Sequence, residues 1–213
     1  MRRNCIYAFD LDGTLLKGNS SWSFYCYGLL QGLFSYKTLP PCIYRFFRFK
    51  FFFGDLPSFY YSIVTRLLSS VPCDDLYEVA LNFVSTLTGS DFYAPVLEKL
   101  EEAFADTTGQ VILFSSSPDF IVHPIAQQLG ISSWYASCYR DQSAEQTIYK
   151  KCLTGDKKAQ ILSYIKKINQ ARSHTFSDHI LDLPFLMLGE EKTVVRPQGR
   201  LKKMAKKYYW NIV

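Results

Sequence analysis

Several features that mark common protein classes are absent from this chain. Its six cysteines form no C-x-x-C pair, which argues against a zinc site. No apolar run cleanly reaches the roughly 20 residues of a membrane span, and no RNA- or DNA-binding signature is present. We expect no secretory signal peptide, because Asp10 interrupts the first apolar stretch. The cysteines are scattered, several in apolar runs, which predicts reduced thiols in a cytosolic protein: Cys5, Cys26, Cys42, Cys73, Cys138 and Cys152.

Size and composition allow a substantial core. The chain has 213 residues, of which 48% are hydrophobic, so it fits one large domain or a core with a small insert. Acidic residues number 19 against 24 basic ones, giving a net charge of +5. This modest excess favours anionic substrates or surfaces without requiring nucleic acid.

The most informative segment is the end of the first apolar run, residues 5–9. It leads directly into Asp10-Leu11-Asp12-Gly13-Thr14. Side chains two apart on an extended strand share a face, so two carboxylates lie close together. Their repulsion favours a bound cation or a retained proton, and carboxylates also serve as Mg²⁺ ligands or as nucleophiles. The alternative is a strand followed by a plain Asp-Gly turn.

Two further motifs suggest an anion site. The apolar run 111–114 ends in Ser115-Ser116-Ser117-Pro118, where a helix start and its hydroxyls would bind an anion. A plain helix cap by Ser117 or a neighbour is the alternative. Gly155 then opens a helical pattern with lysines at 157 and 158. Lysine in a first turn opposes the helix dipole, so either a phosphate lies there or the lysines are solvated.

A last pair of carboxylates follows the apolar run 172–177. Asp178 and Asp182 are four residues apart near a strand-to-helix turn. Carboxylates are ordinary capping residues at such a turn. Ligands of open parallel sheets bind at the carboxyl ends of the strands, and Asp10, Ser115 and Asp178 all fall there.

In this order, the four motifs resemble the haloacid dehalogenase superfamily. They are most similar to its phosphoserine-phosphatase-like branch, subfamily IB, in which a cap is inserted directly after the first motif. The resemblance covers residues 5–18 and about 95–213. It includes Val194-Val195-Arg196-Pro197 and the final helix, whose stripe we expect to comprise Leu201, Ala205, Tyr208 and Tyr209.

The fold we expect is α/β: a Rossmann-like parallel sheet core with an inserted helical (C1-type) cap. Residues 1–15 and 91–213 would form the core, and residues 16–90 the cap. Short apolar runs alternate with helical patterns, as in a sheet covered on both faces. We expect a helix at 91–105 and a hairpin-like excursion at 138–153. The strands are expected near 5–9, 110–114, 133–138, 172–177 and 192–195.

The resemblance implies a Mg²⁺-dependent phosphomonoester hydrolase that works through an aspartyl-phosphate. Asp10 would be the nucleophile, and Asp12 the general acid and base. The residues that would bind substrate phosphate are Ser115, Ser116 and Lys158, the last matching the family's Gly-Glu-x-Lys spacing. Mg²⁺ would be held by Asp10, Asp12 (through its backbone carbonyl) and Asp178, with Asp182 in support.

The substrate is less well defined. Relatives that use phosphoserine carry a glutamate nine residues beyond the nucleophile, where this chain has Asn19. The aromatic, basic segment 44–53 resembles the cap of phosphatidylglycerophosphatases, which implies a lipid headgroup phosphate and peripheral membrane contact through the cap. A small organic phosphate is the other candidate, and an ordinary aromatic cap core remains open for this segment. A non-catalytic phosphate-binding or scaffold protein with the same fold is the alternative function.

Overall fold

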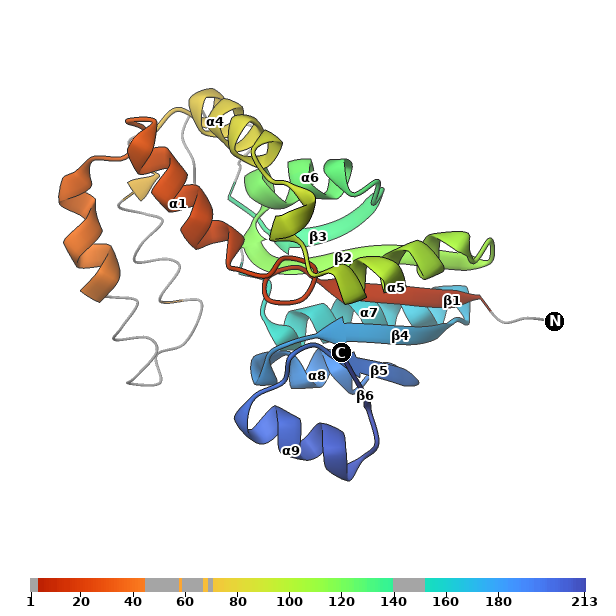
Figure 1. The fold of residues 1–213 in the computed structure, drawn as a ribbon. Helices are drawn as coiled ribbons and strands as arrows, with labels where there is room; N and C mark the ends of the chain where they lie inside the picture. Colours follow the sequence, from red (N-terminus) through yellow and green to blue (C-terminus); the bar gives the residue numbers. More distant parts are fainter. Residues whose placement is uncertain (1–3, 45–57, 59–66, 69–70, 140–151) are drawn as a thin grey trace.

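The computed structural model describes residues 4–44, 58, 67–68, 71–139 and 152–213. Its centre is a six-stranded, all-parallel sheet of order β3-β2-β1-β4-β5-β6 (Figure 1). The expected Rossmann-like α/β fold is confirmed. The strands are β1 (Cys5–Asp10), β2 (Gly109–Pro118), β3 (Ser133–Ser137), β4 (Arg172–Ser177), β5 (Glu191–Val194) and β6 (Asn211–Ile212).

The first strand occupies the middle of the sheet. β1 pairs with β2 on one side and with β4 on the other, so the strand order changes direction at β1. Such a switch point leaves a crevice at the carboxyl ends of the strands, where ligands of these folds bind. Asp10 ends β1 at this position.

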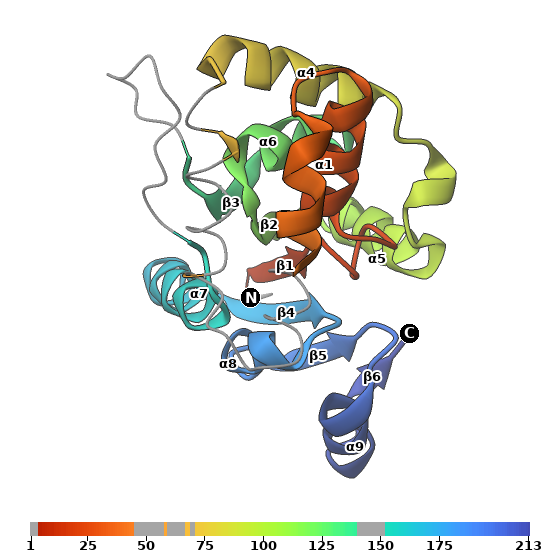
Figure 2. The same ribbon diagram turned by 90° about the vertical axis from the view of Figure 1, so that its left-hand side faces the viewer.

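Alternation along the strands sends side chains into two separate cores. Phe9 and Leu113 belong to one buried cluster, while Ala8 and Ile112 belong to a second. Residues one apart on a strand face opposite sides of the sheet, so both faces are covered. Figure 2 shows α7 and α8 across the sheet from α5.

The helices follow the order expected for a doubly covered sheet, and the short helix α8 is preceded by a 3₁₀ turn, η3. They are α1 (Ser20–Leu30), η1 (Tyr36–Thr38), α4 (Cys73–Ser85), η2 (Gly89–Asp91), α5 (Ala94–Ala105), α6 (Asp119–Gln128), α7 (Gly155–Asn169), η3 (Ile180–Asp182), α8 (Leu183–Leu186) and α9 (Gly199–Lys207).

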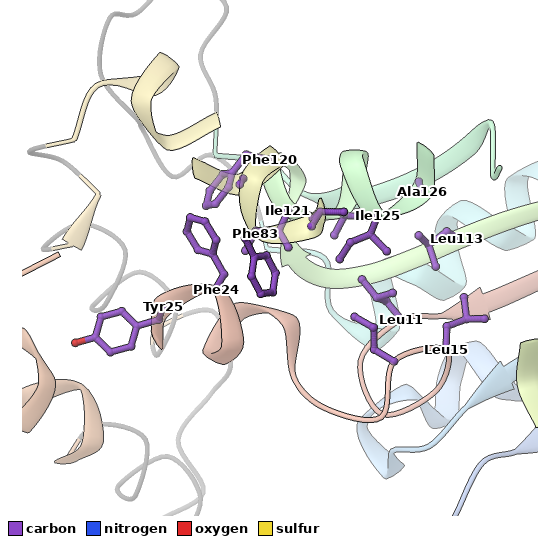
Figure 3. Close-up of a cluster of buried hydrophobic side chains, with 14 of the residues drawn as sticks. Leu11, Leu15, Phe24, Tyr25, Phe83, Leu113, Phe120, Ile121, Ile125 and Ala126 are labelled. Carbon is purple, nitrogen blue, oxygen red and sulfur yellow. The ribbon is translucent and has the colours of Figure 1, made fainter. Parts of the chain in front are cut away.

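The described part of segment 16–90 contains α1, η1 and α4, which lie beyond the carboxyl ends of the strands (Figure 1). Phe24 of α1 joins this segment to the core. Its ring centre is 5.8 Å from that of Phe83 in α4 and 5.5 Å from that of Phe120 in α6, both edge-on (Figure 3). Aromatic pairs favour this geometry. The proposed cap boundaries remain a prediction.

Two expectations about individual side chains are wrong. Leu201 and Ala205 of α9 are buried as expected, but Tyr208 is 53% and Tyr209 is 93% exposed. The reason is that α9 ends at Lys207 and Tyr209 adopts φ +54, which turns the chain out of the helical stripe. Trp210 packs against Leu201 and its neighbours instead.

Other expectations lie outside the described residues. Most of the hairpin-like excursion at 138–153 falls there, as does segment 44–53 apart from its first residue. No described helix has the length and apolar character needed to cross a membrane.

Glu190 ties α7 to the strands β4 and β5. Lys166 Nζ of α7 lies 2.9 Å from Glu190 Oε1, and the backbone N–H of Ser173 donates to Glu190 Oε2 at 2.7 Å. Burial opposes ionisation, but these two hydrogen bonds outweigh it and lower the pKa of Glu190 to about 2. The carboxylate therefore stabilises the fold in its charged form.

We predict that Glu190→Gln loses an acid-sensitive part of stability. Because the pKa of Glu190 is lower in the folded state, its contribution is fully present above the usual glutamate pKa of about 4.3 and falls as the pH drops toward 2. Urea unfolding should show a difference between wild type and variant near pH 7 that shrinks near pH 3. The matched control is Glu101→Gln, an exposed carboxylate on α5. An equal difference at both pH values would contradict this role.

Candidate active site

A buried lysine joins two carboxylates at the carboxyl edge of the sheet. Lys158 Nζ lies 2.7 Å from Asp10 Oδ1 and 2.8 Å from Asp182 Oδ2. The exposed fractions are 2% for Lys158, 5% for Asp10 and 6% for Asp182. These contacts are charge-assisted and almost removed from water, which makes them strong and makes the loss of one partner costly.

Two features bring Lys158 to Asp10: the alternation of side chains along β1, and the close packing of Gly155 against Leu181. Asp10 follows Ile6 and Ala8 at even spacing, so it points to the face that α7 covers. Lys158 lies in the first turn of α7, beside Gly155. A Cβ at Gly155 would lie 2.1 Å from the carbonyl oxygen of Leu181, so glycine lets α7 begin directly against the segment that carries Asp182. Lys157 instead donates to the carbonyl of Cys152 at 2.8 Å.

Electrostatics at this edge favour a further cation. Burial raises the pKa of Asp10 well above its usual range, Lys158 opposes the shift, and Asp182 and Asp178 add to it. Burial alone would lower the pKa of Lys158, but Asp10 and Asp182 raise it. Three neighbouring carboxyl groups thus share one ammonium, and their mutual repulsion when ionised favours a bound cation or a retained proton.

Asp178, directly after β4, lies against the turn that follows β1. A Cβ on Gly13 would lie 2.2 Å from Asp178 Oδ2, so the carboxylate rests against the turn after β1, where Gly13 has φ +78. Burial raises the pKa of Asp178 to about 6, and the charge of Asp182 adds to the shift. The exposed His179 caps the 3₁₀ turn, because its Nδ1 accepts from the N–H of Leu181 at 3.1 Å.

Asp12 is held by groups from two elements. Ser117 Oγ of β2 donates to Asp12 Oδ2 at 2.5 Å, and the backbone N–H of Ser20 in α1 donates to Asp12 Oδ1 at 2.6 Å. The hydroxyls of Ser20 and Ser21 both reach Ser117 Oγ. The alternative of a helix cap by Ser117 or a neighbouring serine is wrong, because β2 continues to Pro118 and α6 has no side-chain cap.

The two serines predicted to bind phosphate make protein contacts of their own. Ser115 Oγ is fully buried and accepts from the N–H of Ser117 at 3.0 Å. Ser116 Oγ donates to the carbonyl of Leu153 at 2.6 Å, on the side of α7. Their role in binding phosphate stays a prediction.

Sequence reasoning missed two supports of the loop after β1. Thr14 Oγ1 donates to Asp10 Oδ2 at 3.2 Å, and Arg196 Nη2 donates to the carbonyls of Gly13 at 2.9 Å and Lys17 at 3.2 Å. Arg196 also covers the ring of Tyr93 at 4.8 Å. In the sequence, the only signs of these supports are the hydroxyl of Thr14 close to the two aspartates and the Arg196-Pro197 pair after β5.

The family model of haloacid dehalogenase-like hydrolases matches residues 7–187. This match includes Asp10, Asp12, Asp178, Asp182 and Lys158. The chain belongs to this family. It is therefore a haloacid dehalogenase-like hydrolase, as the order of the four motifs predicts. No curated protein sequence matches it.

Solved structures share the fold of this haloacid dehalogenase-like hydrolase at low identity. A protein of unknown function from Bordetella pertussis Tohama I has a TM-score of 0.84 at 16% identity, over 100% of this chain and 99% of that one. A haloacid dehalogenase family hydrolase from Salmonella enterica serovar Typhi has a TM-score of 0.74 at 13% identity, and the match covers 95% of this chain and 66% of that one. A phosphoserine phosphatase carrying a phospho-aspartyl intermediate analogue has a TM-score of 0.69 at 15% identity, and the match covers 99% of this chain and 93% of that one.

The oxygen donors at the candidate site are compatible with Mg²⁺, which requires only one or two carboxylate ligands from the protein. Among the described residues, no three His, Cys, Asp or Glu side chains converge on one metal position. Asp182 is bound to Lys158 and Ser177, and the predicted metal-binding roles of the four aspartates stay a prediction. Mg²⁺ needs one or two carboxylates together with other oxygens. Asp10 and Asp178 are the two carboxylates that would take this part if Mg²⁺ binds here.

We predict that Gly13→Ala destabilises the protein more than Gly32→Ala. Both glycines have positive φ, +78 and +76, so both changes carry a backbone cost of about 1–2 kcal/mol. The new Cβ at Gly13 would also displace Asp178, at a further cost of about 1–3 kcal/mol. At Gly32 nothing lies within 4 Å. Urea unfolding measures both, and equal losses would show that the approach of Asp178 does not matter.

Proposed function

We propose that this hydrolase is a Mg²⁺-dependent phosphomonoesterase that forms an aspartyl-phosphate on Asp10. The observation that carries the proposal is the buried Lys158 between Asp10 and Asp182, with Asp12 two residues beyond Asp10. Phosphoryl transfer needs positioning and charge neutralisation more than other chemistry. A fixed carboxylate, a buried ammonium and a second carboxylate provide both.

In the first step, Asp10 attacks the phosphorus and the bond to the leaving alcohol breaks. Asp12 donates a proton to the leaving oxygen, which is general acid catalysis. Lys158 holds Asp10 through Oδ1, so the carboxylate is oriented before substrate arrives.

In the second step, Asp12 takes a proton from water, and that water attacks the phosphorus of the aspartyl-phosphate. This releases inorganic phosphate and regenerates Asp10. When bound by Asp10, the backbone carbonyl of Asp12 and Asp178, Mg²⁺ neutralises charge on the phosphoryl oxygens. Ser115 and Lys158 would contact the same oxygens.

The substrate we propose is a small organic phosphate or a lipid headgroup phosphate such as phosphatidylglycerophosphate, and not phosphoserine. Asn19 stands where phosphoserine-using relatives carry a glutamate. Its Oδ1 accepts from the N–H of Trp22 at 2.9 Å, so this side chain caps α1 and supplies no carboxylate for an amine. Peripheral membrane contact through segment 44–53 belongs to the lipid alternative.

We predict that the purified protein hydrolyses phosphomonoesters with Mg²⁺ and that Asp10→Asn abolishes this activity. The substitution removes the nucleophile at nearly constant volume. The assay is phosphate release from an aryl phosphate, then a screen of soluble phosphomonoesters and of phosphatidylglycerophosphate in detergent. Asp10→Asn activity within about tenfold of wild type would contradict the mechanism. A wild type inactive on every substrate would favour the non-catalytic phosphate-binding alternative.

We predict that Lys158→Ala lowers activity far more than Lys157→Ala. Lys158 Nζ contacts Asp10 and Asp182, whereas Lys157 Nζ contacts only a backbone carbonyl among the described residues. Removing Lys158 leaves two buried carboxylates without their cation. Circular dichroism and thermal melting would first establish that each variant folds. If Lys157→Ala were the more damaging change, the assignment of the phosphate-binding lysine would be wrong.

A further inference from the structure

The hydroxyl of Ser117 uses its full hydrogen-bonding capacity around Asp12. A serine hydroxyl has one donor and two acceptor sites. Ser117 Oγ donates to Asp12 Oδ2 at 2.5 Å and accepts from Ser20 Oγ at 3.0 Å. Ser21 Oγ lies 2.8 Å away at the remaining site. The short bond to Asp12 is the donor bond of this hydroxyl.

These serines come from segments far apart in the sequence. Ser117 is at the end of β2, and Ser20 and Ser21 open α1, 97 and 96 residues earlier. Ser117 is 0% and Ser20 is 2% exposed, so water does not readily replace these contacts. The N–H of Ser20 fixes the other oxygen of Asp12.

We propose that Ser117 is a positioning residue for Asp12, and that its hydroxyl makes the alignment of Asp12 depend on α1 being seated against β2. This inference rests on the proposed function. With both carboxylate oxygens held, Asp12 has a fixed orientation toward the leaving oxygen. Without the Ser117 hydroxyl, Asp12 Oδ2 loses its donor and the side chain can rotate about its remaining bond to Ser20.

The chemical consequence is a selective loss of proton transfer. A poor leaving group such as an alkoxide needs the proton from Asp12, whereas a nitrophenolate does not. kcat/KM reports the steps up to the first irreversible one, here phosphorylation of Asp10, so it isolates leaving-group protonation from later hydrolysis.

The first experiment compares kcat/KM of Ser117→Ala and wild type on an alkyl phosphate and on p-nitrophenyl phosphate. We expect a loss of about 10–100-fold on the alkyl phosphate and less than about threefold on the nitrophenyl ester. Ser117→Cys keeps nearly the same volume with a weak donor, so it should lose activity in the same pattern. Equal losses on both substrates, or a fully active Ser117→Cys, would overturn the proposal.

The matched control is Ser173→Ala. Ser173 is also a buried serine, 2% exposed, but its hydroxyl donates to the carbonyl of Leu188, away from Asp12. It should lose stability without a leaving-group-dependent change in kcat/KM. Urea unfolding of each variant measures the stability loss separately.

A double-mutant cycle tests whether Ser117 acts through Asp12. In an Asp12→Asn background, Ser117→Ala should change kcat/KM on the alkyl phosphate by less than about twofold, because the proton donor is already gone. Additive losses would overturn the positioning role.

A wild type that hydrolyses the nitrophenyl ester, with Ser117→Ala unaffected on both esters, would refute this inference and leave the proposed function standing. A wild type inactive on all esters would refute both.

Discussion

The buried contact of Lys158 with Asp10 and Asp182 is the constraint on which the rest of the site depends. It joins the central strand, the first turn of α7 and the start of α8 at one point, with almost no exposure to water. A buried ion pair of this kind contributes little net stability, but breaking it leaves an uncompensated charge. Its value lies in fixing the orientation of Asp10. The alternation of side chains along β1 directs Asp10 toward α7, and the absence of a side chain at Gly155 lets α7 begin close to Asp182.

The same edge of the sheet combines two environments for its aspartates. Asp10 and Asp178 are buried among other carboxylates, and the pKa values of both are raised. Asp12 instead accepts hydrogen bonds from Ser117 and from the first turn of α1. Carboxylates placed in different surroundings are suited to different tasks. Lys158 opposes the rise in the pKa of Asp10 and so favours the ionised form that a nucleophile requires.

The sequence predicted the sheet and the placement of Asp10 and Lys158, because apolar strands and the motif order depend on local patterns. It did not predict the serine cluster, because Ser20 and Ser117 meet only through tertiary packing and serine before Pro118 is equally typical of a helix cap. Tyr209 was assigned to a helical stripe because periodicity alone does not reveal where a helix ends. Tyr209 adopts a left-handed backbone conformation, which a tyrosine in the sequence does not indicate.

The central place of β1 has a consequence for how the protein is made. Its two neighbouring strands begin at Gly109 and Arg172, and Arg196, which supports the loop after β1, comes later still. During synthesis β1 is therefore made long before its neighbours: one edge can pair only after β2 is made, and the other edge only after β4 is made. Such long-range pairing slows folding and exposes the nascent chain to aggregation. A chain that ends before α7 contains Asp10 but lacks both Lys158, which contacts Asp10, and Asp182, which shares that lysine.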